Sequence, residues 1–287
     1  MKTKVSFIIT IFNNSKYLER CLNSIIKQTK KPDEIIIIDD GSYNTNYILK
    51  ITKFNSWYNK IFFFKNSVNR GPSFARNLGV KKSSYDYICF IDVDDELMPK
   101  YLSNKIDALK KITNHQKLFG IFSNSLIKNN KKISKTNYTQ KETLLDANLV
   151  GKYSGGISGR SIEYIFVKKN LIKVGLYDED LKINEDFDLI IRSIRSGLIL
   201  KNIKSYDTII NHEKNSLTRN DNFKKNYTKE MVFLKKAQKR NYFSKKELIS
   251  RFNYIELKLL KNLALKDFQI NLITNFFLNY YKFLKSL

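Results

Sequence analysis

Three carboxylates, those of Asp92, Asp94 and Asp95, follow directly on an apolar run in the segment "CFIDVDDELMP". Like charges this close repel one another and raise each other's pKa. Such a cluster is therefore expected either in water at a loop or around a bound cation. Hard divalent cations such as Mg²⁺ bind one or two carboxylates together with the phosphates of a substrate. The segment is thus a candidate metal site.

Two further acidic motifs are candidates for chemistry, Asp39 in "IIIIDDGS" and the pair Glu185–Asp186 in "NEDFDL". A carboxylate is the group that takes a proton from an attacking hydroxyl in general base catalysis. Taken singly, each motif has a plainer explanation. An aspartate after a strand is most often a cap or turn residue, and an acidic pair at a helix start complements the helix dipole.

The elements that must position these residues follow an alternating pattern in the first third of the chain. Buried strands are predicted at 4–12, within "DEIIIIDD", at 60–65 and at 85–92. Helices are predicted after an N-cap at Ser15, within "YILKITKF", and from Pro72 after the chain-breaking Gly71. This alternation indicates a parallel α/β sheet, whose ligands bind at the carboxyl ends of the strands. Asp39 and Asp92 both fall at such ends, so we expect them on one shared rim.

The remainder of the chain is expected to continue the sheet and then to become helical. A strand is predicted at 117–127, an exposed turn at 128–140, and a short strand and helix within 163–181. A helix that begins with the acidic pair places Leu189, Ile190 and Ile194 on one face. Residues 222–287 show two or three amphipathic helical patterns.

The charge of the chain is strongly positive, +25 from 52 basic and 27 acidic residues among 287. Such a charge attracts nucleic acid, anionic membranes or phosphorylated substrates. Lysines spread along the chain fit a biased composition equally well. The last segment, "NLITNFFLNYYKFLKSL", interleaves aromatics and lysines as membrane-surface helices do. Packing of that face on the main domain or on a second subunit is the alternative.

The compartment is expected to be cytoplasmic, with the protein soluble or peripheral on the inner face of the membrane. No secretory signal is visible, and no stretch reaches the ~20 apolar residues of a membrane-spanning helix. Cys21 and Cys89 lie within apolar patterns, so we expect them to be reduced core thiols.

The order and spacing of these motifs resemble those of family 2 inverting glycosyltransferases with the GT-A fold, over roughly residues 4–219. The matching segments, in chain order, are "VSFIITIFNNSKYLERCLNSIIKQT", "IIIIDDGS", "NRGPSFARNLG", the DXD-like "IDVDD", "NEDFDLIIR" and "HEKNSLTR". The resemblance implies an α/β fold with a Rossmann-like, mixed and mainly parallel sheet flanked by helices. It divides the chain into a catalytic domain over 1–219, with a nucleotide-sugar half at about 1–98 and an acceptor half at about 99–219, and a helical extension over 220–287.

The resemblance also implies which residues bind the donor. Asp39 would accept a hydrogen bond from uracil, Phe12 would stack on the base, and Asn69 would help to read it. Arg76 would contact the diphosphate, where a guanidinium matches two oxygens at once. Thr10 and Phe12 stand where the family more often has Pro and Tyr, so the phenolic hydrogen bond is lost there.

A divalent cation, Mn²⁺ or Mg²⁺, is implied at the DXD-like motif. Asp94 is the main expected ligand, and Asp92 would assist through the ribose or a metal-bound water. Asp95 is either a substitute ligand or a cap of the following helix. His212 would be a third ligand or a diphosphate contact.

The general base of an inverting transfer is expected at Asp186, with Glu185 as its neighbour. Asp188 is a further candidate for the same role. Ser216 and Arg219, in the late "HEKNSLTR" segment, are weaker candidates for the donor site.

The predicted function is metal-dependent transfer of a sugar from a nucleotide-sugar donor, a UDP-sugar above others, to a hydroxyl of a glycan or glycolipid acceptor. Lipopolysaccharide, capsule and lipid-linked oligosaccharide are the acceptors expected for such enzymes, and an anionic membrane surface is a possible partner of the C-terminal helices. One alternative is a nucleotidyltransferase, which would need a glycine-rich loop where this chain has "TIFNNSKY". The other is a basic nucleic-acid-binding protein, which would leave the acidic motifs unexplained; no nucleic-acid partner is therefore expected.

Overall fold

The structure is a computed structural model, and it describes residues 3–43, 59–129, 132–138, 156–211 and 223–264, together with 279, 283 and 285. The chain divides into two compact units, one of residues 1–180 and 185–213, the other of residues 181–184 and 214–287. The helix expected in "YILKITKF" and the domain boundary expected at residue 219 both lie outside the described residues. That boundary and the division at about residue 98 stay predictions.

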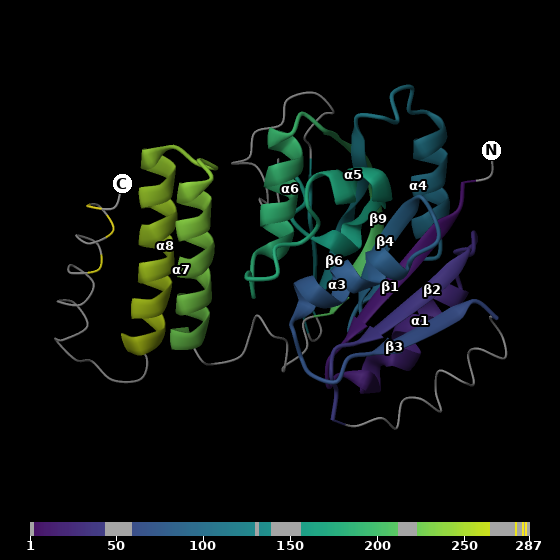
Figure 1. Cartoon of the computed structure of the whole chain (residues 1–287), viewed down its shortest axis with the longest axis horizontal. Helices are drawn as coiled ribbons and strands as arrows, with labels where there is room; N and C mark the ends of the chain where they lie inside the picture. Colours follow the sequence, from purple (N-terminus) through teal and green to yellow (C-terminus); the bar gives the residue numbers. More distant parts are fainter. Residues whose placement is uncertain are drawn as a thin grey trace. The chain divides into compact units, whose positions relative to one another are not determined.

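One sheet organises the first unit, and its described strands run in the order β3-β2-β1-β4-β8-β6-β9-β5, with β7 beside β6 (Figure 1). The strands are β1 (Val5–Ile11), β2 (Glu34–Asp39), β3 (Ile61–Lys65), β4 (Tyr87–Asp92), β5 (Glu96–Leu97), β6 (Leu118–Asn129), β7 (Lys132–Lys135), β8 (Tyr164–Val167) and β9 (Ile199–Asn211). The pairs among β1 to β4 and the pair β6–β9 are parallel, whereas β8, β7 and β5 pair antiparallel. This mixed α/β sheet confirms the predicted fold class.

Helices flank the sheet. Those of the first unit are α1 (Leu18–Ile26), α3 (Pro72–Lys82), α4 (Tyr101–Lys110), α5 (Lys168–Lys173) and α6 (Glu185–Arg195). β1 and β2 are buried along almost their whole length. Alternate residues of these strands therefore pack into two hydrophobic layers, one on each face of the sheet. On one face, Phe7 and Ile9 of β1 share a core with α1 and α4. On the other, α3 packs against β1 and β2 (Figure 1).

A glycine allows α3 to approach the sheet closely. A Cβ added at Gly79 would lie 2.4 Å from Cγ2 of Ile8, so any side chain there would force helix and strand apart. At the start of the same helix, Gly71 has φ of 100° and Pro72 occupies the first turn, as the sequence predicts. Together they fix how the segment after β3 turns into α3, which carries Arg76.

Several local predictions are wrong. Ser15 is not the N-cap of α1, because residues 15–17 form a short 3-10 turn and the helix begins one residue later behind Tyr17. Asp95 does not cap a helix, since α4 begins only at Tyr101 behind Lys100. Within the segment expected to be an exposed turn at 128–140, the structure has β7, which pairs with β6 as a hairpin.

Besides β7, two further strands have no counterpart in the sequence-based prediction, β5 and the long β9. β9 pairs with β6 through three register shifts, so its inward-facing residues do not keep a simple alternation. Lysines also interrupt its apolar pattern at 201 and 204. Because of these irregularities, the alternation of apolar and polar residues alone does not predict this strand.

The second unit contains α7 (Phe223–Lys239) and α8 (Lys245–Ala264), which pack against each other. Buried residues of the two helices include Phe233, Leu234, Leu248 and Phe252. This confirms helices in the first part of 222–287, while most of the last segment lies outside the described residues. No helix in the described part of the chain has the length and apolar character needed to cross a bilayer.

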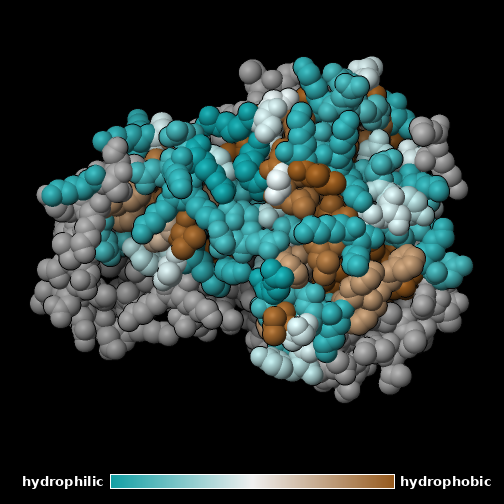
Figure 2. Space-filling view, viewed as in Figure 1, coloured by the Kyte–Doolittle hydropathy of each residue, from teal (hydrophilic) through white to brown (hydrophobic). Residues whose placement is uncertain are grey.

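The surface drawn in Figure 2 is mainly hydrophilic, with hydrophobic residues confined to smaller patches.

Both cysteines are free and buried, as predicted for core thiols. Burial raises the pKa of the Cys89 thiol to about 12, so it stays protonated and unreactive near neutral pH.

Candidate active site

The carboxyl ends of β1, β2 and β4 form one rim, which carries Thr10, Phe12, Asp39 and Asp92 of the predicted donor residues. In the parallel register Thr10 pairs with Asp92 across β1 and β4, while Ile11 pairs with Asp39 across β1 and β2. Phe12 follows β1 directly and is half-buried. The expectation that Asp39 and Asp92 share one rim is therefore confirmed.

Asp39 is fully buried at this rim, and its carboxylate organises the turn after β2. Its Oδ1 accepts a hydrogen bond from the Ser42 amide at 2.9 Å, and Lys65 Nζ lies 4.0 Å from Oδ2. The Ser42 hydroxyl in turn accepts a hydrogen bond from the backbone N–H of Asn13 at 2.9 Å. The loops after β1 and β2 are thus tied together around Asp39.

The neighbouring Asp40 has a structural role that the sequence reading missed. Its carboxylate accepts hydrogen bonds from the Gly71 amide at 2.6 Å, the Arg70 amide at 3.0 Å and the Asn66 side chain at 2.8 Å. Asn69, predicted to read the base, also donates to it at 3.0 Å. Asp40 therefore shapes the whole approach from β3 to α3, and through it the position of Asn69.

The loop that follows β4 is clamped from two sides, which fixes the main chain of Asp94. Arg20 of α1 and Asn211 at the end of β9 both donate to the Asp94 carbonyl, Asn211 at 3.1 Å. The Asp95 side chain is only 6% exposed, and its carboxylate accepts from the Asn211 amide at 2.8 Å. Burial raises the pKa of Asp95, and the nearby Asp94 and Asp92 raise it further. Asp95 thus anchors the loop to β9.

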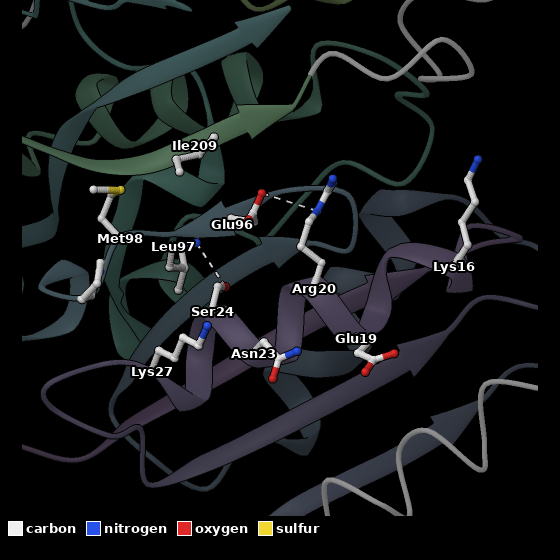
Figure 3. Close-up of a pocket in the computed structure, with 11 residues that line it drawn as sticks. Lys16, Glu19, Arg20, Asn23, Ser24, Lys27, Glu96, Leu97, Met98 and Ile209 are labelled. Atoms are coloured by element: carbon white, nitrogen blue, oxygen red, sulfur yellow. Dashed lines mark hydrogen bonds and ion pairs between the residues drawn. The ribbon is translucent and has the colours of Figure 1, made fainter. Parts of the chain in front are cut away.

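A shallow groove beside this loop shows the α1 side of the clamp (Figure 3). Arg20 Nε lies 3.4 Å from the carboxylate of Glu96, and the Ser24 hydroxyl accepts from the Leu97 amide at 3.1 Å. Both interactions are drawn as dashed lines between α1 and β5. They brace β5, which follows the Asp94 loop directly, against the helix after β1.

Arg76 joins the acidic motifs to one another. Its guanidinium lies 3.0 Å from Asp92 Oδ1, 2.8 Å from Glu185 Oε1 and 3.6 Å from Asp186 Oδ1. Arg76 is only 5% exposed, and burial by itself would lower its pKa. The three nearby carboxylates outweigh this effect, so the pKa of Arg76 is raised. The predicted contact of Arg76 with a diphosphate stays a prediction; in the structure its partners are the carboxylates, with the ring of Tyr177 5.4 Å away.

Asp186, the predicted base, lies in the first turn of α6. The Ser161 hydroxyl donates to its Oδ1 at 2.6 Å, and the Ser161 amide lies 3.3 Å from its Oδ2. Burial raises the pKa of Asp186 to about 6, against the opposing effect of the Arg76 charge. A carboxylate with such a pKa is ionised near neutral pH and is basic enough to take a proton.

The other expected site residues divide into two groups. Asp188 is fully buried and pairs with Arg192 at 2.7 Å within α6, an arrangement that stabilises the helix. His212, Ser216 and Arg219 lie outside the described residues. Their predicted roles stay predictions.

The described residues fit a divalent cation that is bound together with phosphate. Asp94 sits on a fixed loop, and the Asp92 side chain is 40% exposed although one oxygen is held by Arg76. Among the described residues no set of three or more His, Cys, Asp or Glu side chains converges into a cage. One or two carboxylates with a coordination shell completed by substrate phosphates and water are typical of Mg²⁺ sites.

Three residues of the site were not identified from the sequence as functional: Ser161, Tyr177 and Asn77. Asn77 lies in the "ARN" segment, and its side chain bonds the Tyr177 amide and carbonyl, each at 2.9 Å. The hydroxyl of Tyr177 bonds that of Ser161, which bonds Asp186. Only Asn77 had a sequence signal, its place inside a recognised motif. Ser161 and Tyr177 have no distinctive spacing.

Comparison with known proteins identifies relatives of the chain. The family model described as "Glycosyl transferase family 2" matches residues 6–165. An uncharacterized glycosyltransferase of Rickettsia typhi is 30% identical over 202 residues, 67% of this chain and 58% of the relative. The poly-beta-1,6-N-acetyl-D-glucosamine synthase of Staphylococcus aureus (strain COL) is 30% identical over 193 residues, 63% of this chain and 43% of that protein.

The relatives are longer than the region they share with this chain, which spans 58% or less of the length of the Rickettsia proteins it matches. Among solved structures, that of S. aureus TarS 1-349 in complex with UDP-GlcNAc superposes with a TM-score of 0.61 at 17% identity. The match covers 99% of this chain and 74% of the other. At that identity the likeness shows a common fold.

Proposed function

Because the chain belongs to glycosyl transferase family 2, we propose that it transfers a sugar from a UDP-sugar to a hydroxyl of a glycan acceptor with inversion at the anomeric carbon. The observation that carries this proposal is the Arg76 network. One guanidinium brings together Asp92 at the end of β4 and the Glu185–Asp186 pair at the start of α6. A donor-side carboxylate and a basic carboxylate thus lie near different terminal nitrogens of one buried guanidinium.

The reaction needs one displacement. The acceptor oxygen forms a bond to the anomeric carbon while the bond from that carbon to the diphosphate oxygen breaks. The electron pair leaves with the diphosphate, and the acceptor proton passes to the carboxylate of Asp186. Its pKa of about 6 suits a general base at neutral pH. The fixed positions of Asp186 and Asp92 supply the orientation that such a transfer requires.

The donor site follows from the rim of β1, β2 and β4. The buried Asp39, held in place by Ser42, would accept from the uracil ring, and the half-buried Phe12 would cover the base. Asp94, with Asp92, would hold Mn²⁺ or Mg²⁺. When bound, such a cation neutralises the charge that develops on the diphosphate leaving group. The UDP-GlcNAc complex of TarS, which has the same fold, supports a uridine donor.

The acceptor is proposed to be a glycan of the cell surface, either a polysaccharide or a glycolipid. The name of the S. aureus relative, a poly-beta-1,6-N-acetyl-D-glucosamine synthase, supports a carbohydrate acceptor.

The net charge of +25 and the lysine- and aromatic-rich last segment support contact with an anionic membrane surface. Removing residues 267–287 should release the protein from anionic vesicles and leave donor hydrolysis nearly intact. Unchanged vesicle binding would exclude this segment as the contact.

The test of the proposed function is turnover of UDP-sugars by the wild type and by Asp186→Asn. UDP release is measured across a panel of UDP-sugars, and NMR follows the anomeric configuration of the product. The wild type should give the inverted anomer, and Asp186→Asn should lose about 10²–10⁴-fold in rate with UDP binding preserved. Asp107→Asn, which removes an exposed carboxylate on α4, is the matched control. Retention of configuration, or full activity of Asp186→Asn, would contradict the proposal.

A further inference from the structure

Two buried hydroxyl groups lie behind Asp186, on Ser161 and Tyr177. The Ser161 hydroxyl bonds both the Tyr177 hydroxyl and Asp186 Oδ1, the latter at 2.6 Å. An ionised carboxylate can only accept, so Ser161 donates to Asp186. Burial, followed by the Asp186 charge, raises the pKa of Tyr177, which therefore keeps its proton and donates to Ser161. The hydrogen bonds run in one direction, from Tyr177 through Ser161 to Asp186.

The main chain of Ser161 is fixed from the sheet side. Ser161 begins a 3-10 turn that ends at Glu163. The Glu163 carboxylate is fully buried and accepts from the hydroxyls of Ser125 in β6 and of Ser158. The hydroxyl of Tyr101, from α4, donates to the carbonyl of Ile162 at 3.0 Å. A turn anchored in this way holds the Ser161 hydroxyl at one position.

Tyr177 is fixed as firmly from the other face. Asn77 of α3 bonds both its amide and its carbonyl at 2.9 Å. Its ring packs edge-on against Phe90 of β4, with 5.4 Å between ring centroids. Both hydroxyls are therefore presented to Asp186 by elements that do not belong to α6. The segment before Tyr177 is also tied to α6 itself, because Arg192 donates to the Leu176 carbonyl at 2.6 Å.

The two oxygens of Asp186 are consequently unequal. Oδ1 receives the short Ser161 hydroxyl bond and faces Arg76 at 3.6 Å. Oδ2 receives the longer contact from the Ser161 amide, at 3.3 Å. A short hydroxyl bond and a cation on the same oxygen fix the rotation of the carboxylate. They leave Oδ2 as the oxygen with the greater capacity to accept another proton.

We propose that Ser161, supported by the Tyr177 hydroxyl, is a positioning residue that fixes the Asp186 carboxylate so that Oδ2 takes the acceptor proton. The inference rests on the proposed role of Asp186 as the base. In the transfer, the acceptor oxygen bonds to the anomeric carbon as the diphosphate leaves, and the proton moves to Oδ2. Ser161 and Tyr177 keep their own protons throughout.

The test compares Ser161→Ala, Ser161→Thr and Tyr177→Phe with the wild type. Loss of a hydrogen bond to a charged group predicts that kcat of Ser161→Ala falls about 10- to 100-fold. The donor KM and the Kd for UDP should change less than about twofold, since the hydroxyl is expected to act on the base and not on donor binding. Ser161→Thr keeps the hydroxyl and should recover most of the rate. Tyr177→Phe should show a smaller loss in the same direction.

A pH profile separates positioning from general destabilisation. The charged and titratable groups facing Asp186 are Arg76 from α3, Asp92 from β4, Tyr164 from β8, the adjacent Glu185, and Tyr177. Removing the Ser161 hydroxyl leaves all of them in place and withdraws a bond that favours the ionised carboxylate. The acid limb of kcat/KM should therefore move to higher pH in Ser161→Ala. Mere loss of folded protein would lower the rate equally at every pH.

The matched control is Ser193→Ala, a fully buried serine of α6 whose hydroxyl donates to the Ile190 carbonyl at 2.8 Å. It should leave the pH profile unchanged. Wild-type kcat and profile in both Ser161→Ala and Tyr177→Phe, beside an inactive Asp186→Asn, would overturn the inference alone. If Asp186→Asn stays active, the proposed function fails instead. If Ser161→Ala does not fold, as judged by circular dichroism, Tyr177→Phe decides: an unshifted profile overturns the inference.

Discussion

Replacing Arg76 by methionine tests whether its charge holds the acidic motifs together. Methionine keeps an unbranched, flexible side chain but removes the guanidinium. Asp92, Glu185 and Asp186 would then face one another without the cation that lies 2.8 to 3.6 Å from each of them. Because Arg76 is 5% exposed, water cannot easily replace it. We therefore expect a large loss of stability.

The size of the loss follows from the burial of the three partners. Removing one member of a buried ion pair costs about 3–5 kcal/mol. The Glu185 and Asp186 side chains are 12% and 19% exposed and belong to this class, whereas Asp92 is 40% exposed and adds about 1 kcal/mol or less. Since the uncompensated carboxylates can still reach some solvent, we expect a decrease of about 3–4 kcal/mol in the free energy of unfolding at pH 8.

The pH dependence of the stability loss distinguishes a charge effect from a packing effect. Arg76 lowers the pKa of Asp186 in the wild type, so its removal raises that pKa further above the unfolded value. A group whose folded pKa is raised contributes stability at low pH that is lost as pH rises through the folded pKa. The deficit of Arg76→Met relative to the wild type should therefore be greater at pH 8 than at pH 5.

The assay is urea unfolding followed by circular dichroism at both pH values, with Arg76→Lys as the matched control. Lysine keeps the charge but presents a single ammonium in place of the planar fork, so an intermediate loss of about 1–2 kcal/mol is expected. Equal deficits at pH 5 and pH 8 would show that Arg76 acts through packing. A deficit under about 0.5 kcal/mol would refute the network as a source of stability.

Three further predictions follow from the same geometry. The kcat/KM for donor should fall about tenfold per pH unit below pH 6, because the base Asp186 has a pKa of about 6; a flat profile between pH 5 and 7 would exclude it as the titrating base. Asp40→Ala should cost about 2–4 kcal/mol in urea unfolding and raise the donor KM, because it leaves the Arg70 and Gly71 amides without their acceptor; Asp40→Asn should cost less. Gly79→Ala should cost about 1–3 kcal/mol, and combining it with Ile8→Ala should cost less than the sum of the single changes, as a double-mutant cycle of unfolding energies would show.

The parallel half of the sheet was predictable from the sequence because its central strands β1, β2 and β4 are buried over most of their length. Continuous apolar runs such as those of β1 and β2 have few other solutions in an alternating α/β pattern. The same reasoning located Asp39 and Asp92, since strand ends in parallel register must share a rim. Gly71 and Pro72 likewise fixed the start of α3.

The other half, in which parallel and antiparallel pairs are mixed, was less predictable because several of its strands are irregular or short. β9 changes register against β6, and β5 is only two residues long. The sequence gives no signal for the bond between Ser161 and Asp186, because it depends on a turn that long-range contacts hold in place. The bridging role of Arg76 was hidden for a related reason. An arginine guanidinium binds a phosphate and a carboxylate equally well, and only the fold shows which groups lie next to it.

The central claim is that the rim bearing Asp39, Asp92 and Asp94 binds a nucleoside diphosphate together with a divalent cation. The most direct measurement is calorimetric titration of UDP, with GDP as the control nucleotide, into the full chain with and without Mn²⁺, repeated on Asp94→Ala. UDP binding that requires Mn²⁺ and disappears in Asp94→Ala is the predicted result. Absence of UDP binding, or binding indifferent to both Mn²⁺ and Asp94, would contradict it.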